Sequence, residues 1–177
     1  MSGISLATNS GVAAAEGATT VDSLFGQTFT TSPLSHTAGL QNGVLGETLG
    51  LQTLEEQTGL KFNPLQNNSG NGADGVAIDD ANMTIWNAEV KSSQNGVSAA
   101  ATAQGNPATK LQTWVDSSLN PAPGSPWNAQ PATNQALAQS IQDAIDAGYQ
   151  IKGVQIQVGV PKPGTSGVGQ VLINPWP

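Results

Sequence analysis

Helical spacing of apolar residues is clearest between residues 42 and 59. The apolar residues near one face of this segment are Leu45, Leu49 and Leu54. Because an α-helix turns once in 3.6 residues, this spacing favours a helix that packs one face on a core. Gly59 follows the periodic residues, at a position where glycine commonly ends a helix. The pattern therefore predicts a helix over residues 42–59.

Two further helices are predicted in the second half of the chain. Asn106 and Pro107 form a good N-cap and first-turn pair for a helix over residues 107–119. Residues 132–148 carry one apolar stripe and end at a glycine. The stripe consists of Leu137, Ile141, Ala144 and Ile145.

Strand-like patterns occupy most of the remaining apolar segments. Residues 75–78 and 84–91 flank a turn at 79–83 and indicate a hairpin. Residues 60–67 are extended in character and contain Pro64, which favours a sheet edge or a turn. The other strand candidates are residues 149–160 and 169–176. Together with the helices, these strands predict a mixed α/β domain.

Residues 1–38 differ from the rest because they lack clear periodicity and are rich in Ser, Thr, Gly and Ala. This composition predicts a linker or a loosely docked extension, in which a short segment such as residues 21–29 can still pack on the domain. The chain thus divides into an extension over 1–38 and one domain over 39–177, which is large enough to bury a core. His36, the only histidine, lies in the extension, and we expect it to be solvated.

Charge is scarce and mostly negative. The chain has five lysines, no arginine and twelve acidic residues, which give a net charge of -7. This balance weighs against tight nucleic-acid binding, because phosphate neutralisation by basic residues supplies much of that affinity. The absence of cysteine excludes disulfides and thiolate metal sites, and a single histidine excludes a multi-histidine metal site. No apolar run approaches the ~20 residues that span a membrane.

Three charged residues, Asp74, Glu89 and Lys91, lie at one end of the predicted hairpin. A four-residue turn at 80–83 sets a register in which partner numbers sum to 163, so that Asp74 stands opposite Glu89. The same register pairs Val76 with Asn87 and Ile78 with Ile85. Directly opposed carboxylates repel at the ~4.5–5.5 Å between such β-carbons, unless a positive group lies between them.

Lys91 is one source of that positive charge, because residues two apart in a strand point to the same face. A divalent metal ion is a second source, and oxygen ligands with open water positions suit Mg²⁺. The alternative is an ordinary solvent-exposed ion pair between Lys91 and one of the two acids. A slip of one residue in the register would place the acids on opposite faces of the sheet.

The order of these features resembles the PD-(D/E)xK nuclease superfamily, which has the restriction-endonuclease-like fold. The matching features are a helix with a glutamate near its start, a glycine-rich loop, "GAD" at 72–74 and "AEVK" at 88–91. Residues 58–93 look like the C-terminal nuclease toxin domains of bacterial polymorphic toxins. The resemblance implies a mixed sheet flanked by helices. Ala73 stands where the family often has a proline.

The resemblance also implies an endonuclease site that uses Mg²⁺ or Mn²⁺. The implied metal ligands are Asp74, Glu89 and the Val90 backbone carbonyl. Lys91 would orient or polarise the attacking water and stabilise charge on the phosphate. Glu47 is the candidate helix carboxylate, for which a solvated surface glutamate is the alternative. Gln94, shortly after the motif, would contact the scissile phosphate.

By the same resemblance, the protein is expected to be an antibacterial DNase toxin with a cognate immunity protein. We expect it to be made in the cytoplasm, delivered by a secretion system without a classical signal peptide, and active in the target-cell cytoplasm. One alternative is an RNase, such as a tRNA-cleaving toxin, on the same fold. Another is a non-catalytic binding or adhesion module that stacks sugars on its tryptophans. The four tryptophans are Trp86, Trp114, Trp127 and Trp176.

Overall fold

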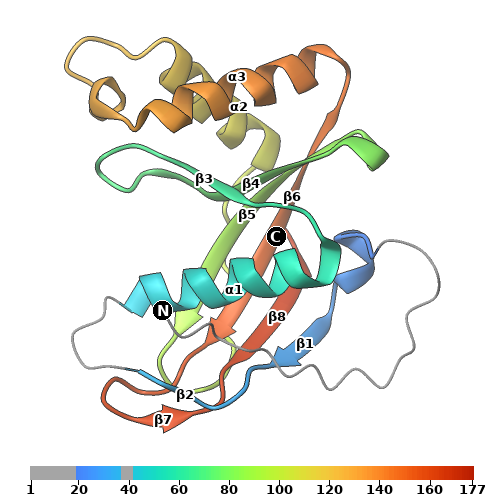
Figure 1. The fold of residues 1–177 in the computed structure, drawn as a ribbon, viewed down its shortest axis with the longest axis vertical. Coiled ribbons are helices and arrows are strands. Elements are labelled where there is room, and N and C mark those ends of the chain that lie inside the picture. Colours follow the sequence, from blue (N-terminus) through green and yellow to red (C-terminus); the bar gives the residue numbers. More distant parts are fainter. Residues whose placement is uncertain (1–18, 37–41) are drawn as a thin grey trace.

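The computed structural model describes residues 19–36 and 42–177 of the chain. At its centre is a six-stranded sheet in the order β1-β8-β6-β5-β4-β3 (Figure 1). Neighbouring strands are antiparallel except β5 and β6, which are parallel. The six strands are β1 (Gln27–Thr30), β3 (Asn63–Gln66), β4 (Gly72–Asp79), β5 (Thr84–Ser93), β6 (Gln150–Gly159) and β8 (Gln170–Pro175). Two short strands, β2 (Leu34–Ser35) and β7 (Ser166–Gly167), pair with each other apart from this sheet.

The described residues also form three α-helices and three 3₁₀ turns. The helices are α1 (Asn42–Thr58), α2 (Pro107–Leu119) and α3 (Ala132–Asp146). The turns are η1 (Asp22–Leu24), η2 (Asp80–Asn82) and η3 (Pro126–Ala129). The segment that contains α2 and α3 connects β5 to β6, because a parallel pair needs a long crossover to return the chain to the same end of the sheet. The predicted α/β class, a mixed sheet with flanking helices, is confirmed in these terms.

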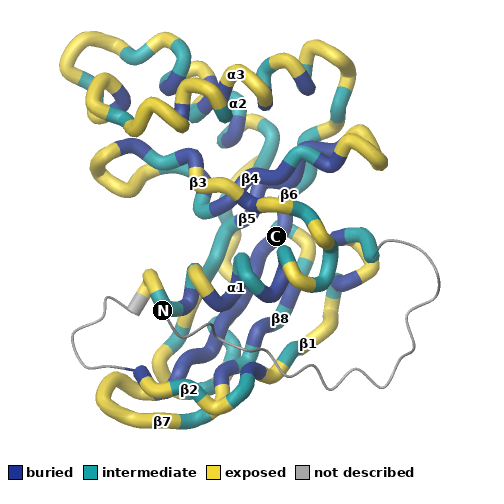
Figure 2. Tube along the Cα trace, in the orientation of Figure 1, coloured by how far each residue is buried: buried dark blue, intermediate teal, exposed yellow. Residues whose placement is uncertain are grey.

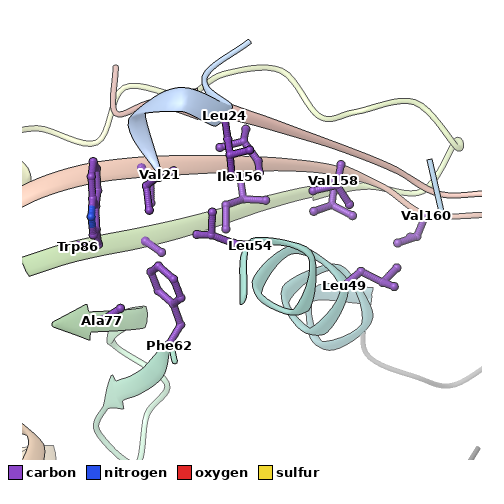
Figure 3. Close-up of a cluster of buried hydrophobic side chains, with 14 residues drawn as sticks. Val21, Leu24, Leu49, Leu54, Phe62, Ala77, Trp86, Ile156, Val158 and Val160 are labelled. Carbon is purple, nitrogen blue, oxygen red and sulfur yellow. The ribbon is translucent and has the colours of Figure 1, made fainter. Parts of the chain in front are cut away.

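The two helical layers lie on opposite faces of the sheet. Trp86 and Ala88 of β5 belong to the core under α1, whereas Ile85 belongs to the core under α2 and α3. Successive side chains of a strand point to opposite faces, so the two cores are separated by the sheet itself. Figure 3 shows Leu49 and Leu54 of α1 within the first of these cores. The central strands are accordingly the most buried part of the molecule (Figure 2).

The sequence signals at the helix ends have the expected structural basis. Gly59, directly after α1, has φ 73°, a left-handed conformation that glycine adopts without steric penalty. The Asn106 side chain caps α2 by accepting a hydrogen bond from the Thr109 N–H at 2.9 Å. The strand with Pro64 lies at the sheet edge, as expected. Within the described part of the chain, none of the helices combines the length and apolar character that crossing a membrane requires.

Part of the predicted N-terminal extension packs on the domain. Residues 1–18 and 37–38 of that extension lie outside the described residues. Val21 and Leu24 are buried in the core under α1, and β1 pairs with β8 at the other sheet edge. The expectation of a solvated His36 was wrong, because its side chain is only 1% exposed and Nδ1 lies 2.7 Å from the Pro161 carbonyl. Its polar sequence neighbours gave no signal of this distant partner.

Two glycines let α1 approach the sheet closely. Gly46 and Gly50 are four residues apart and therefore lie on one side of the helix. A β-carbon at Gly46 would stand 2.4 Å from Cβ of Ser92, and one at Gly50 would stand 2.9 Å from Cγ2 of Ile156. Real side chains do not pack at such distances, so a larger residue at either position would shift the helix or the strand.

The sheet face opposite α1 carries buried amide side chains on β6. The Gln155 amide bonds both backbone groups of Thr102, accepting from its N–H at 3.0 Å and donating to its carbonyl at 2.7 Å. Gln157 donates to the Ala99 carbonyl at 2.9 Å and accepts from the Asn174 amide of β8. These bonds hold the segment over residues 94–106, here called the covering segment, against the sheet.

Candidate active site

The β4–β5 hairpin has the predicted register. Val76 pairs with Asn87 and Ile78 with Ile85, as the sum of 163 requires. Asp79 stabilises the turn, because its carboxylate accepts hydrogen bonds from both the backbone and the side chain of Asn82. The recorded pairs extend only as far as Gly75 and Ala88, one residue short of the expected Asp74–Glu89 pair.

The pairing register between β4 and β3 shifts by one residue next to Asp74. Asn63 pairs with Val76, but Leu65 pairs with Ala73, so a step of two residues on β3 faces a step of three on β4. The additional residue on β4 lies at position 74 or 75, between these two pairs. Bulges of this kind re-aim a side chain and are common beside active sites.

The Asp74 carboxylate has two protein partners. Its Oδ2 accepts a hydrogen bond from the Val90 N–H at 2.8 Å, and its Oδ1 accepts one from Nε2 of Gln66 at 3.0 Å. The Asp74 side chain therefore accepts a hydrogen bond from β5 just beyond the last backbone pair between β4 and β5. In an extended strand the N–H and C=O of one residue point to the same side, so the Val90 carbonyl faces the side on which Asp74 lies.

Lys91 and Glu89 form a close ion pair along β5. Nζ of Lys91 lies 2.5 Å from Oε1 of Glu89, and the two side chains are 30% and 13% exposed. Lys61, which follows the C-terminal end of α1, also pairs with a glutamate but is 73% exposed. The Lys91–Glu89 pair is thus far more shielded than an ordinary surface pair, and its members lie on one strand instead of facing each other across two.

The acidic side chains interact electrostatically across three elements. Burial, the charge of Asp74 and then the charge of Glu89 raise the pKa of Glu47 on α1. Burial is also the largest cause that raises the pKa of Asp74 to about 6, with a further contribution from the charge of Glu89. Hydrogen bonds from Val90 and Gln66 and the charge of Lys91 oppose this rise. Glu47 is therefore half-buried and interacts electrostatically with both hairpin acids, although α1 covers the sheet face opposite to the one that carries Glu89.

Gln94 is the predicted site residue that the structure places elsewhere. It lies one residue past the end of β5 and lines a cavity of about 430 Å³ with residues of the 161–168 segment. Among the described residues, no hydrogen bond joins Gln94 to Asp74, Glu89 or Lys91. Its assignment as a phosphate contact therefore gains no support from its position.

Gln66 is the site residue that sequence reasoning missed. It ends β3 and pairs with Gly72, which brings its amide beside Asp74. Gly72 has φ 144°, and a β-carbon there would lie 1.9 Å from the Leu65 carbonyl, so only glycine fits this close approach. A hairpin prediction that joined residues 63–66 to 72–76 would have placed Gln66 next to Asp74.

The donor atoms at this site suit a hard divalent cation. Mg²⁺ prefers oxygen ligands and is commonly held by one or two carboxylates together with several waters. Asp74, Glu89 and the Val90 carbonyl offer such oxygens, and each carboxylate oxygen can accept more than one partner. As they stand, the described residues contain no group of three His, Cys, Asp or Glu side chains placed to hold a metal ion. The fit therefore rests on two carboxylates and a carbonyl.

The tryptophans give little support to a sugar-stacking surface. Trp86 and Trp127 are buried in the two cores, at 2% and 7% exposure. Trp114 and Trp176 are partly buried, and the Lys110 ammonium lies 5.2 and 5.6 Å from their ring centroids. All four side chains thus have a packing role.

The clustered acids, the adjacent lysine and the hairpin end form the most distinctive polar site in the described structure. It combines oxygen ligands for a cation with a shielded positive charge, an arrangement suited to chemistry on an anionic substrate. Comparisons with known protein families, with curated proteins and with solved structures find no match for this chain.

Proposed function

We propose that the protein is a metal-dependent endonuclease with the restriction-endonuclease-like fold. The observation that carries this proposal is the Glu89–Lys91 ion pair of β5 beside Asp74 of β4, with Glu47 interacting electrostatically from α1 on the other face of the sheet. Buried like charges raise the energy of the folded protein, so such a cluster points to function more than to stability. The order of the motifs in the sequence supports the same reading.

In this proposal Asp74, Glu89 and the Val90 carbonyl would hold Mg²⁺ or Mn²⁺. The bound ion would lower the pKa of a water and offset charge that develops on phosphorus. Lys91 supplies a fixed positive charge beside the phosphate, and Glu89 keeps its ammonium in place through the 2.5 Å ion pair. We assign Glu47 to accept the water proton, because its raised pKa makes it a stronger base than an ordinary carboxylate. The water oxygen then bonds to phosphorus as the bond to the leaving oxygen breaks.

DNA is the substrate we propose first, with RNA as the alternative on the same site. We further propose that the enzyme acts as an antibacterial toxin and that an immunity protein blocks it in the producing cell. The net charge of -7 supports a partner with a basic contact surface, because opposite charges accelerate association.

A cleavage assay with paired lysine variants tests the proposal. Plasmid DNA and total RNA are incubated with the purified chain, with Mg²⁺ or with EDTA. We expect Mg²⁺-dependent cleavage that Lys91→Ala reduces by at least 100-fold while the protein stays folded. Lys91→Arg should also fail, because a planar guanidinium does not replace a compact ammonium.

Lys61→Ala is the matched control, because it removes an equally charged but exposed partner of a glutamate. It should leave cleavage unchanged. Cleavage at the wild-type rate by folded Lys91→Ala would refute the assignment of this site, and so would full activity in EDTA.

A further inference from the structure

A cleft lies between β3 and the start of α3. Its volume is about 620 Å³, within the range of pockets that bind small molecules. One wall comes from β3 and the turn after it, and the other from the first turns of α3. The lining residues include Asn63, Pro64, Gln66, Asn134, Ala136 and Leu137.

The chemistry of this lining is uncharged and hydrogen-bonding. Amide groups stand on both walls, while Pro64 and Leu137 add apolar surface. No lysine or acid is among the described residues that line the cleft. Asn134 is only 4% exposed and bonds the Gln66 carbonyl, so it builds the wall, whereas the amides of Asn63 and Asn68 are exposed and can reach a ligand. Asn and Gln amides pair with the donor and acceptor edges of nucleobases, and apolar side chains suit their faces.

The cleft is connected to the proposed active site through Gln66. The Asn134 side chain donates to the Gln66 backbone carbonyl at 2.6 Å, and the Gln66 side chain donates to Asp74 at 3.0 Å. Only one residue therefore separates the cleft from a proposed metal ligand. A ligand in the cleft would lie beside the substrate phosphate and could influence Asp74 through the Gln66 amide.

The charge of the chain indicates how a nucleic acid would be held here. With five lysines, no arginine and a net charge of -7, contacts to phosphates are a weak source of affinity. We infer that the cleft is a nucleobase subsite, which holds an unpaired base next to the scissile phosphate and makes single-stranded nucleic acid the preferred substrate. This inference rests on the proposed nuclease function, but base binding is measurable without cleavage.

The test fills the cleft and measures binding of nucleosides in EDTA. Adenosine, guanosine, cytidine and uridine are titrated into the protein by calorimetry. Ala136→Phe adds a ring at the α3 wall, and Asn63→Phe adds one from the β3 wall. At least one nucleoside should bind the wild type, and each filled variant should weaken it at least tenfold. Gln135→Phe is the matched control, since it is exposed on the same helix outside the cleft and should leave affinity unchanged.

A second measurement compares cleavage of one oligonucleotide sequence as a single strand and as a duplex, with Mg²⁺. The single strand should react at least tenfold faster, and the filled variants should remove this preference. Failure of all four nucleosides to bind, or equal affinity in the folded filled variants, would overturn the subsite. Cleavage that depends on Lys91 but not on the cleft would keep the nuclease and reject the subsite. Nucleoside binding without any cleavage would keep the base-binding cleft and reject the nuclease.

Discussion

Two sets of polar side chains lie side by side on β5 and β6, and they are satisfied in opposite ways. Glu89 pairs in register with Gln155, and Lys91 pairs with Gln157. The Gln155 amide makes two hydrogen bonds to the covering segment and is fully buried. On β5, Glu89 is paired with Lys91 and lies near Asp74 of β4, whose pKa is raised chiefly by burial.

The difference separates polar residues that stabilise the folded protein from those that destabilise it. A buried amide with all its partners adds stability, because each lost partner would leave a desolvated group. A buried carboxylate near other carboxylates reduces stability unless a cation or a proton compensates it. Glu89 has a cation in Lys91, so it is the buried carboxylate of Asp74 on β4 that requires an explanation beyond folding.

The largest effect on stability should come from the amide side of this comparison. Gln155→Leu leaves both backbone groups of Thr102 without their partner, which should lower the free energy of unfolding by about 2–4 kcal/mol. Urea unfolding measures this change. Gln150→Leu, an exposed position on the same strand, is the control and should change stability by less than about 0.5 kcal/mol. Equal decreases in the free energy of unfolding of the two variants would show that the hydrogen bonds to Thr102 do not contribute to stability.

Asp74→Asn should act in the opposite direction. The folded pKa of about 6 exceeds the ordinary aspartate pKa of 3.8, so the folded protein binds the proton more tightly than the unfolded chain does. The contribution of Asp74 to stability is therefore full below about pH 4 and is lost as pH rises through 6. In EDTA at pH 8 the variant should be more stable by at most about 3 kcal/mol, because Asn keeps only one acceptor oxygen for the Val90 and Gln66 donors, with little difference at pH 4.

The comparison with Asp143→Asn controls for the change in net charge, because Asp143 is an exposed helix residue. Thermal melts across pH 4–8 provide the measurement. A pH-independent effect of Asp74→Asn, or an equal effect of the control, would contradict the burial argument.

Glu47→Gln should give the smallest gain. Its carboxylate is less buried than that of Asp74, and part of its raised pKa comes from the charge of Asp74. The variant should therefore stabilise the protein at pH 8 by less than Asp74→Asn does. In an Asp74→Asn background the gain should shrink further, because one source of repulsion is already gone. Glu56→Gln on the exposed side of α1 is the control, and additive effects of the two site variants would argue against coupling between Glu47 and Asp74.

Local rules predicted the elements that the sequence marks strongly. The apolar spacing and Asn106 located the helices, and the length of the turn after Asp79 set the hairpin register that the structure shows. Elements with few neighbours were missed. β1 is a four-residue edge strand with one partner, and β2 and β7 have two residues each, too short to show an alternating pattern.

The site was predictable in its residues but not in its detailed contacts. Asp74, Glu89 and Lys91 followed from hairpin spacing, and Glu47 from the resemblance. The register shift between β3 and β4, which falls between Asn63 and Leu65, had no sequence signature, and neither did the end of the β4–β5 pairing at Gly75 and Ala88. Partners that depend on distant chain segments, such as Gln66 for Asp74 and Pro161 for His36, are set by tertiary packing alone.

Gly46 and Gly50, on the sheet side of α1, minimise the distance between the helix and the sheet. Glycine lowers the intrinsic stability of a helix interior by roughly 0.5–1 kcal/mol relative to alanine, yet α1 has two of them where it crosses the strands. With hydrogen atoms in place of methyl groups at positions 46 and 50, the helix axis can come nearer to β5 and β6. Glu47 is the next residue after the first glycine, so the depth of this contact sets how strongly its carboxylate is coupled to the acids of the hairpin. Residues without any charge thereby determine the electrostatics of the site.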